Sequence, residues 1–139
     1  MIRQPAVCLL LNGSIVILAG LLTGFPLRSA ILRRGENLNA WRVAHSVLIM
    51  DGLFMLVVGM ILPHLPLEGN AVSILVWSLA SAGYGFVAAF TLGAWKGLRG
   101  LTVRPYGMNT LLFGTHMIGA IGSLLGVTIM IYGFLKTLI

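Results

Sequence analysis

Four long apolar runs constrain this chain more than any other feature of its sequence. They cover residues 6–25, 41–62, 72–94 and 109–135, and a helix needs about 20 mostly apolar residues to cross a bilayer. The runs are continuous and lack the alternation of barrel strands, which are about ten residues long, so they predict helices. We therefore expect an all-α integral membrane protein with four transmembrane helices in a single domain, residues 1–139.

The composition excludes the other broad classes. Hydrophobic residues make up 58% of the chain and charged residues 9%, whereas soluble domains carry roughly a quarter charged residues. A soluble enzyme and a disordered chain are both excluded. The net charge of +6 does not indicate a nucleic-acid partner, because the basic residues fall between the apolar runs. Cys8 is the one cysteine, so no intrachain disulfide forms.

Basic residues gather in the first and third connections between the runs, and few lie on the other side. The positive-inside rule then predicts an integral protein of a bacterial-type inner membrane, with both termini outside the cytoplasm. Trp41 and Trp95 stand at the boundaries of the same basic side, as an interfacial aromatic belt predicts. The basic residues of the two connections are Arg28, Arg33, Arg34, Lys96, Arg99 and Arg104.

Small residues inside the runs predict close helix packing. Gly20 with Gly24, and Gly122 with Gly126, form small-xxx-small pairs, which let helix backbones approach one another in lipid. Packing within one chain is the better interpretation of each pair. Several small faces nevertheless leave surface for a homo-oligomer.

Three ionisable residues at membrane depth are the candidate functional residues: His45, Asp51 and His116. Such groups are costly in lipid and usually face a protein interior or a cavity. His45 and Asp51 share one helix but are six residues apart, which places them about 120° apart around the axis and about 9 Å apart along it. They therefore point to different neighbours. His64 follows Pro63 in a short connection and is interpreted as a solvated loop residue.

Each of the three residues has two interpretations. His45 is either an iron ligand or a histidine bonded to a facing backbone carbonyl, and the second is more common. Asp51 is either a protonated acid that donates a hydrogen bond, or it links helices through a partner such as Asn12. His116 either completes a bis-histidine haem site with His45 or is a satisfied histidine. No phosphate-binding loop, zinc motif or nucleophile elbow is present.

The segment Trp41–Gly52, WRVAHSVLIMDG, resembles the styrene oxide isomerase family, which are small four-helix integral membrane enzymes with the pattern W-x-x-A-H-S. The resemblance covers nearly the whole chain, although the first connection is shorter here. It continues at Leu62–Pro63, Arg99–Thr102, Pro105 and Gly126–Val127, and in the first run at Gly13, Leu21, Leu22 and Gly24.

The resemblance implies a homotrimer that holds haem b between neighbouring subunits, with His45 as the axial ligand. It also implies a redox-neutral Meinwald rearrangement, in which ferric iron acts as a Lewis acid on an epoxide oxygen and a 1,2-hydride shift yields an aldehyde. Lewis-acid activation needs an open coordination site, which favours one protein ligand. The family has no histidine that matches His116.

Two positions differ from the family pattern. Asp51 stands where the family has a substrate-side asparagine, and a protonated acid would still donate a hydrogen bond to the epoxide oxygen. Phe90 stands where the family has a tyrosine; it would line an apolar pocket, and its missing hydroxyl would have to come from Tyr84.

We therefore predict a haem b-dependent isomerase for a small apolar aryl epoxide. The alternatives are a haem protein for electron transfer or sensing, ligated by His45 with or without His116, and a membrane protein that binds no haem.

Overall fold

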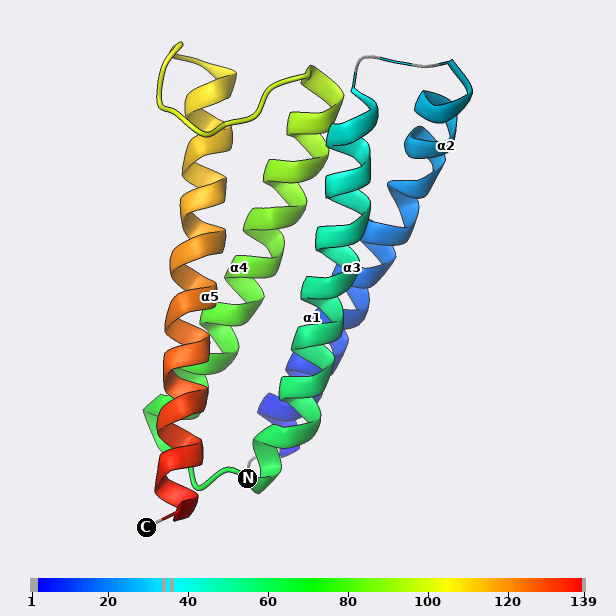
Figure 1. Ribbon diagram of the computed structural model, residues 1–139. Helices are drawn as coiled ribbons and strands as arrows, with labels where there is room; N and C mark the ends of the chain where they lie inside the picture. The colour runs from blue at the N-terminus through cyan, green and yellow to red at the C-terminus, as the bar shows by residue number, and fades with distance from the viewer. Residues whose placement is uncertain (1–2, 34, 36, 139) are drawn as a thin grey trace.

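The computed structural model describes residues 3–33, 35 and 37–138, and its regular elements are all helical (Figure 1). The elements in chain order are α1 (Arg3–Leu22), α2 (Gly24–Arg33), α3 (Leu38–Ile61), the short 3₁₀ turn η1 (Leu62–His64), α4 (Gly69–Lys96) and α5 (Met108–Leu138). The prediction of an all-α fold is confirmed. Arg34, one of the basic residues used to predict the orientation, lies outside the described residues.

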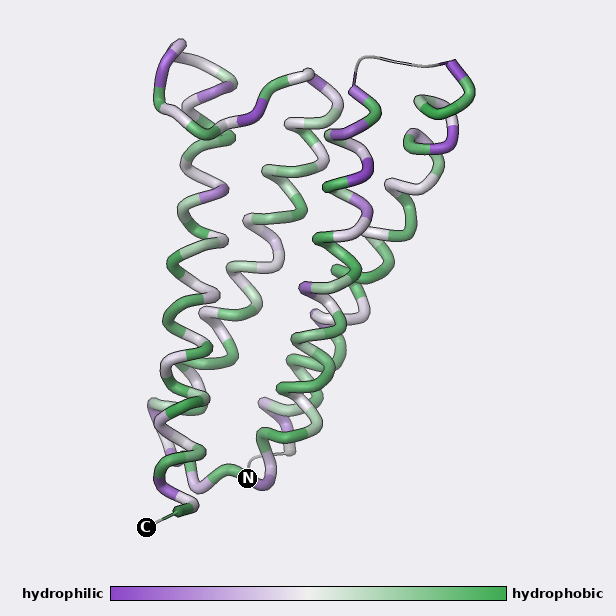
Figure 2. The backbone as a smooth tube through the Cα atoms, in the orientation of Figure 1, coloured by the Kyte–Doolittle hydropathy of each residue, from purple (hydrophilic) through white to green (hydrophobic). Residues whose placement is uncertain are grey.

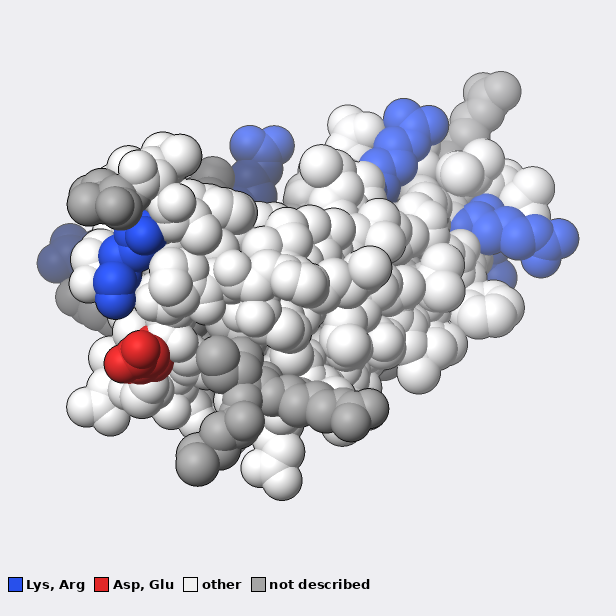
Figure 3. Space-filling view, turned by 90° about the horizontal axis from the view of Figure 1, so that it is seen from below, with Lys and Arg blue, Asp and Glu red and all other residues white. Residues whose placement is uncertain are grey.

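Four helical segments of the described chain are long and apolar enough to cross a membrane: Gln4–Arg33, Leu38–His64, Gly69–Lys96 and Met108–Leu138. Most hydrophilic positions lie at the two ends of these helices, and the lengths between are largely hydrophobic (Figure 2). Seen from below, the surface carries few charged side chains (Figure 3).

The first segment differs from its predicted bounds because it is broken near Thr23 and then continues as α2. Pro26 has no N–H, and a proline ring clashes with the carbonyl four residues earlier, here that of Leu22. This explains why α1 ends at Leu22. Downstream of Pro26, Leu27–Leu32 supplies good helix formers, so the helix reaches Arg33, inside the stretch predicted to be the first connection.

The helices are arranged as two closely packed pairs. α1 packs along α3, and α4 packs along α5 (Figure 1). α4 also packs against α1 and α3, whereas α5 packs, among the described helices, against α4 alone. The buried core lies where α1, α3 and α4 meet, around Leu9, Val16, Met55 and Leu75. The start of α1 and the end of α5 lie at the same end of the molecule (Figure 1).

The two predicted small-residue pairs lie in contacts within the chain. A Cβ on Gly20 would lie 2.9 Å from the backbone nitrogen of Ile49 on α3. A Cβ on Gly122 would lie 2.6 Å from the carbonyl oxygen of Ser78 on α4, and Gly126 faces the Leu79 side chain. Packing within the chain, the better interpretation of each pair, is therefore confirmed at these residues.

Candidate functional site

His45 lies in the third turn of α3, is partly buried, and faces the junction of α1 and α2. Its Nδ1 is 2.9 Å from the carbonyl oxygen of Gly20 and 3.4 Å from Oγ1 of Thr23. Thr23 Oγ1 itself donates to the same Gly20 oxygen at 2.5 Å. The ring also packs on Gly24, where a Cβ would lie 3.5 Å from Cε1 of His45, an ordinary van der Waals distance.

The Gly20 contact determines which nitrogen of His45 carries the proton. A carbonyl oxygen only accepts hydrogen bonds, so Nδ1 is the N–H of the neutral ring and Nε2 keeps a free lone pair. Nε2 has no hydrogen-bond partner among the described residues. Histidines that ligate metals are oriented in the same way, by a hydrogen bond from their second nitrogen to a carbonyl. The two sequence-based interpretations of His45 are therefore compatible.

His116 on α5 has the opposite arrangement. Its Nε2 lies 3.2 Å from the carbonyl oxygen of Arg99, so Nε2 is the N–H and Nδ1 is free. The ring of Phe90 on α4 meets it edge-on, with centroids 5.0 Å apart at 82°. In the part of the chain that the structure describes, α3 and α5 do not pack against each other, and His45 faces α1 and α2. Within one subunit, the structure does not bring His45 and His116 together.

Asp51 lies near the middle of α3 and points to α4. Its Oδ2 would be 3.3 Å from a Cβ on Gly83, and this oxygen is buried with no hydrogen-bond partner in the described part of the chain. The proposed partner, Asn12, instead donates to the Cys8 carbonyl at 2.7 Å and accepts from Tyr84 at 2.6 Å. The interpretation of Asn12 as the partner of Asp51 is therefore wrong.

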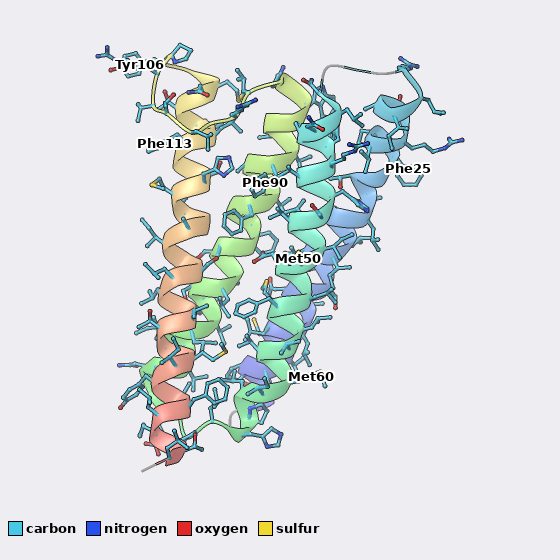
Figure 4. All side chains as sticks on the ribbon, viewed as in Figure 1. Phe25, Met50, Met60, Phe90, Tyr106 and Phe113 are labelled. Carbon is cyan, nitrogen blue, oxygen red and sulfur yellow. The ribbon has the colours of Figure 1, made fainter. Side chains whose placement is uncertain are left out.

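Phe90 lines a half-open cleft of about 500 Å³ at the basic end of the molecule. Figure 4 shows Phe90 on the side of α4 that faces α5. The cleft lies between the start of α3, the last turns of α4, the segment that follows α4, and α5. Its lining residues are Asn37, Asn39, Ala40, Val43, Ala89, Phe90, Gly93, Ala94, Gly97, Leu98, Arg99, Leu101 and His116.

The cleft combines an apolar wall with polar groups contributed by Asn37, Asn39, Arg99 and His116. Pockets for small molecules usually have this character and a volume of about 300–1,000 Å³. Gly97 helps to shape the cleft because it ends α4 in the left-handed conformation, with φ 67°, which glycine adopts without steric cost.

The three candidate residues Asp51, Phe90 and His45 do not meet at one place within the chain. Asp51 faces Gly83, and Phe90 follows Gly83 by seven residues, which is two helical turns, or about 10 Å, along the same face of α4. Asp51 is not among the residues that line the cleft. His45 lies about 120° away from Asp51 around α3, toward α1 and α2. The structure therefore places Asp51 between α3 and α4, Phe90 against His116 of α5, and His45 at the junction of α1 and α2.

Tyr84 does not supply the hydroxyl that Phe90 lacks. It lies six residues before Phe90, which turns it about 120° around α4, and its hydroxyl is bonded to Asn12 on α1.

The sequence analysis missed Gly20 and Thr23 as partners of His45. The usable signal was Pro26, which places a helix break, and hence unpaired carbonyls, one turn upstream. The described residues contain no group of three or more His, Cys, Asp or Glu side chains that could hold a metal ion, so an iron at His45 would need further ligands from a cofactor.

These features define a small all-helical protein with four helices able to span a membrane and a histidine whose Nε2 is open. A family model described as styrene oxide isomerase matches residues 6–135. The chain therefore belongs to the styrene oxide isomerase family, as its sequence motifs predict. No curated protein and no solved structure matches the chain. Membership in this family suggests an isomerase-like function.

Proposed function

We propose that this protein is a haem b-dependent membrane isomerase that converts a small aryl epoxide to an aldehyde. The observation that carries the proposal is the arrangement at His45: Nδ1 is held by the Gly20 carbonyl at 2.9 Å, and Nε2 has no partner among the described residues. In a member of this family, such a histidine would be suited to hold a haem iron as its single protein ligand.

The donor set fits a haem better than a bare ion. His45 would hold the iron through Nε2 as the single protein ligand, the porphyrin would supply the remaining nitrogen ligands, and substrate could then bind the iron. Ferric haem, when bound, supplies a Lewis acid for the epoxide oxygen. The hydrogen moves within the substrate, so the reaction needs no external reductant or oxidant. His45 contributes the position and the electron donation of Nε2, both of which depend on the bond from Nδ1 to Gly20.

Asp51 would act on the substrate oxygen. A carboxyl group at membrane depth without a cation takes up a proton, and the protonated Oδ2 then donates a hydrogen bond, as the family's asparagine would. The unpartnered state of this oxygen supports the role, because it leaves the group free to meet a ligand. Phe90 would line the apolar pocket, where the exclusion of water protects a reactive carbocation from hydrolysis.

The complete site would be formed between subunits of a homotrimer. His45 faces α1 and α2, whereas Phe90 faces α5. In a closed ring of three copies, the surface that carries His45 in one copy would meet the surface that carries Phe90 in the next copy. The basic end would lie in the cytoplasm and both termini outside it, in a bacterial-type inner membrane.

An absorption spectrum of the detergent-purified protein tests haem binding directly. A Soret band, present after purification or after haem supplementation, is expected; its absence in both cases would overturn the proposal. Incubation with a panel of aryl epoxides should then yield aldehydes. Failure to turn over any of them would contradict the isomerase, and a low-spin spectrum abolished by His116→Ala would indicate an electron carrier instead.

A further inference from the structure

The break between α1 and α2 leaves the Gly20 carbonyl without its helical partner. In a continuous helix the Gly20 carbonyl would accept the N–H of Gly24. α1 ends at Leu22, and although Thr23 N–H still bonds to Ala19 at 3.2 Å, Gly24 N–H does not bond to Gly20. Gly20 is buried, and a buried carbonyl without a partner is costly.

Two side chains satisfy this carbonyl. Thr23 donates its hydroxyl to it at 2.5 Å, and His45 donates Nδ1–H at 2.9 Å. Since a carbonyl oxygen has two lone pairs, both donors bind together. Thr23 is only 4% exposed, so its hydroxyl has no water to bond instead, and this donor is held in place by burial.

The same arrangement surrounds the N–H of His45 with two oxygens. The hydrogen of the Thr23 hydroxyl points to Gly20, so its lone pairs remain available to Nδ1–H, 3.4 Å away. A proton placed on Nε2 instead would set the Nδ1 lone pair against the Gly20 carbonyl oxygen, and Thr23 would have to turn its hydroxyl away from Gly20 to donate to Nδ1. The pair of oxygens therefore favours one tautomer and one ring orientation.

We propose that Thr23 is a positioning residue for His45: with the freed Gly20 carbonyl, it holds the imidazole as the Nδ1–H tautomer and keeps the Nε2 lone pair directed to the cofactor. The proposal rests on the proposed function for the identity of that cofactor. The tautomer itself is a property of the chain without haem. A hydrogen-bond acceptor at Nδ1 raises the basicity of a ligating imidazole at Nε2. A more basic ligand also stabilises ferric iron relative to ferrous iron.

The first test uses the haem-free full-length protein in detergent, labelled with ¹⁵N-histidine, at about pH 9, above the usual range of histidine titration. Ring nitrogen shifts should show His45 as the Nδ1–H tautomer. His116, whose Nε2 faces Arg99, should show the opposite tautomer and so provides an internal reference. Finding His45 as the Nε2–H tautomer overturns the proposal without any mutation.

The second test compares Thr23→Val with Thr23→Ser. Valine keeps the shape and removes the hydroxyl; we expect a mixture of tautomers, haem affinity about 10- to 100-fold weaker and a higher midpoint potential. Serine keeps the hydroxyl and should restore all three readouts. The matched control is Thr128→Val on α5, whose hydroxyl bonds to Leu124 at 2.8 Å away from either histidine, and which should behave as the wild type.

The outcomes separate this proposal from the function on which it rests. If wild-type protein binds haem but Thr23→Val matches the Thr128→Val control in tautomer and affinity, the positioning role is wrong and the function stands. If the wild type binds no haem, the proposed function fails, and the nitrogen shifts still decide the tautomer. If Thr23→Val does not fold, Thr23→Ser and the wild-type shifts carry the test.

Discussion

His45 and His116 present opposite ring nitrogens to their surroundings. The Gly20 carbonyl holds Nδ1 of His45 at 2.9 Å, whereas the Arg99 carbonyl holds Nε2 of His116 at 3.2 Å. The free nitrogen is therefore Nε2 in His45 and Nδ1 in His116. Nδ1 is bonded to the ring carbon that carries Cβ, so the side chain would crowd a planar porphyrin whose iron was bound there. The two histidines are not equivalent candidates for a haem ligand.

This asymmetry predicts different effects of two alanine substitutions. His45→Ala should abolish the Soret band or weaken haem binding by more than about 100-fold, since it removes the proposed ligand itself and not only the groups that position it. His116→Ala should keep the band and its five-coordinate character. Titration of the apo-protein with haem, followed by absorption, measures both. Equal losses in the two variants would contradict assignment of a single ligand.

Asp51 should show opposite effects on activity and stability. Asp51→Leu removes a buried oxygen that has no partner among the described residues. The free energy of unfolding in detergent should therefore rise by about 1 kcal/mol. The same change removes the proposed donor to the substrate oxygen and should lower kcat by about 100- to 1,000-fold.

Asp51→Asn is the matched control, because its amide also donates a hydrogen bond, and it should keep the rate within about 10-fold. If Asp51→Leu is as active as the wild type, the carboxyl group has no part in the reaction.

Phe90→Tyr should restore the hydroxyl that the family pattern has at this position. The ring already lines the cleft beside His116, so the added hydroxyl reaches polar surroundings without a new apolar clash. We expect kcat/KM for aryl epoxides to rise by about 10-fold, because the variant gains one neutral hydrogen bond to the substrate. Haem affinity should stay unchanged. Phe113→Tyr, on α5 and not among the lining residues, controls for a hydroxyl elsewhere. Matching effects of both changes would show that the cleft is not the substrate pocket.

The four spans were predictable because lipid imposes a simple rule: about 20 apolar residues and every backbone group bonded within the helix. The continuation of α2 to Arg33 was not predicted, because hydropathy falls at Arg28 while helix propensity does not. The two properties separate at the membrane surface, where water permits a polar helix.

The candidate site was only partly predictable. The angle of about 120° between His45 and Asp51 around one helix correctly predicted that they have different neighbours. His45 faces α1 and α2, and Asp51 faces Gly83 of α4. It could not supply the partners, which depend on how helices are placed against each other. Asn12 is an example: its amide was available to Asp51 by polarity alone, but helix packing sets it against Tyr84.

Gly52 and Gly114 should respond to alanine in opposite ways. A Cβ on Gly52 would lie 2.7 Å from the Gly13 carbonyl oxygen and 2.8 Å from the backbone nitrogen of Ile17. Backbone atoms cannot rotate away, so α1 and α3 must separate, and unfolding in detergent should be easier by about 1–3 kcal/mol. Because α1 carries Gly20, this separation should also weaken haem binding.

At Gly114 nothing lies within 4 Å of a Cβ, and alanine is the better helix former by about 1 kcal/mol. Gly114→Ala should therefore be neutral or stabilising, with haem affinity unchanged. Thermal unfolding and haem titration of both variants check this, and a Gly52→Ala protein as stable as Gly114→Ala would show that α1 and α3 do not pack as closely as described.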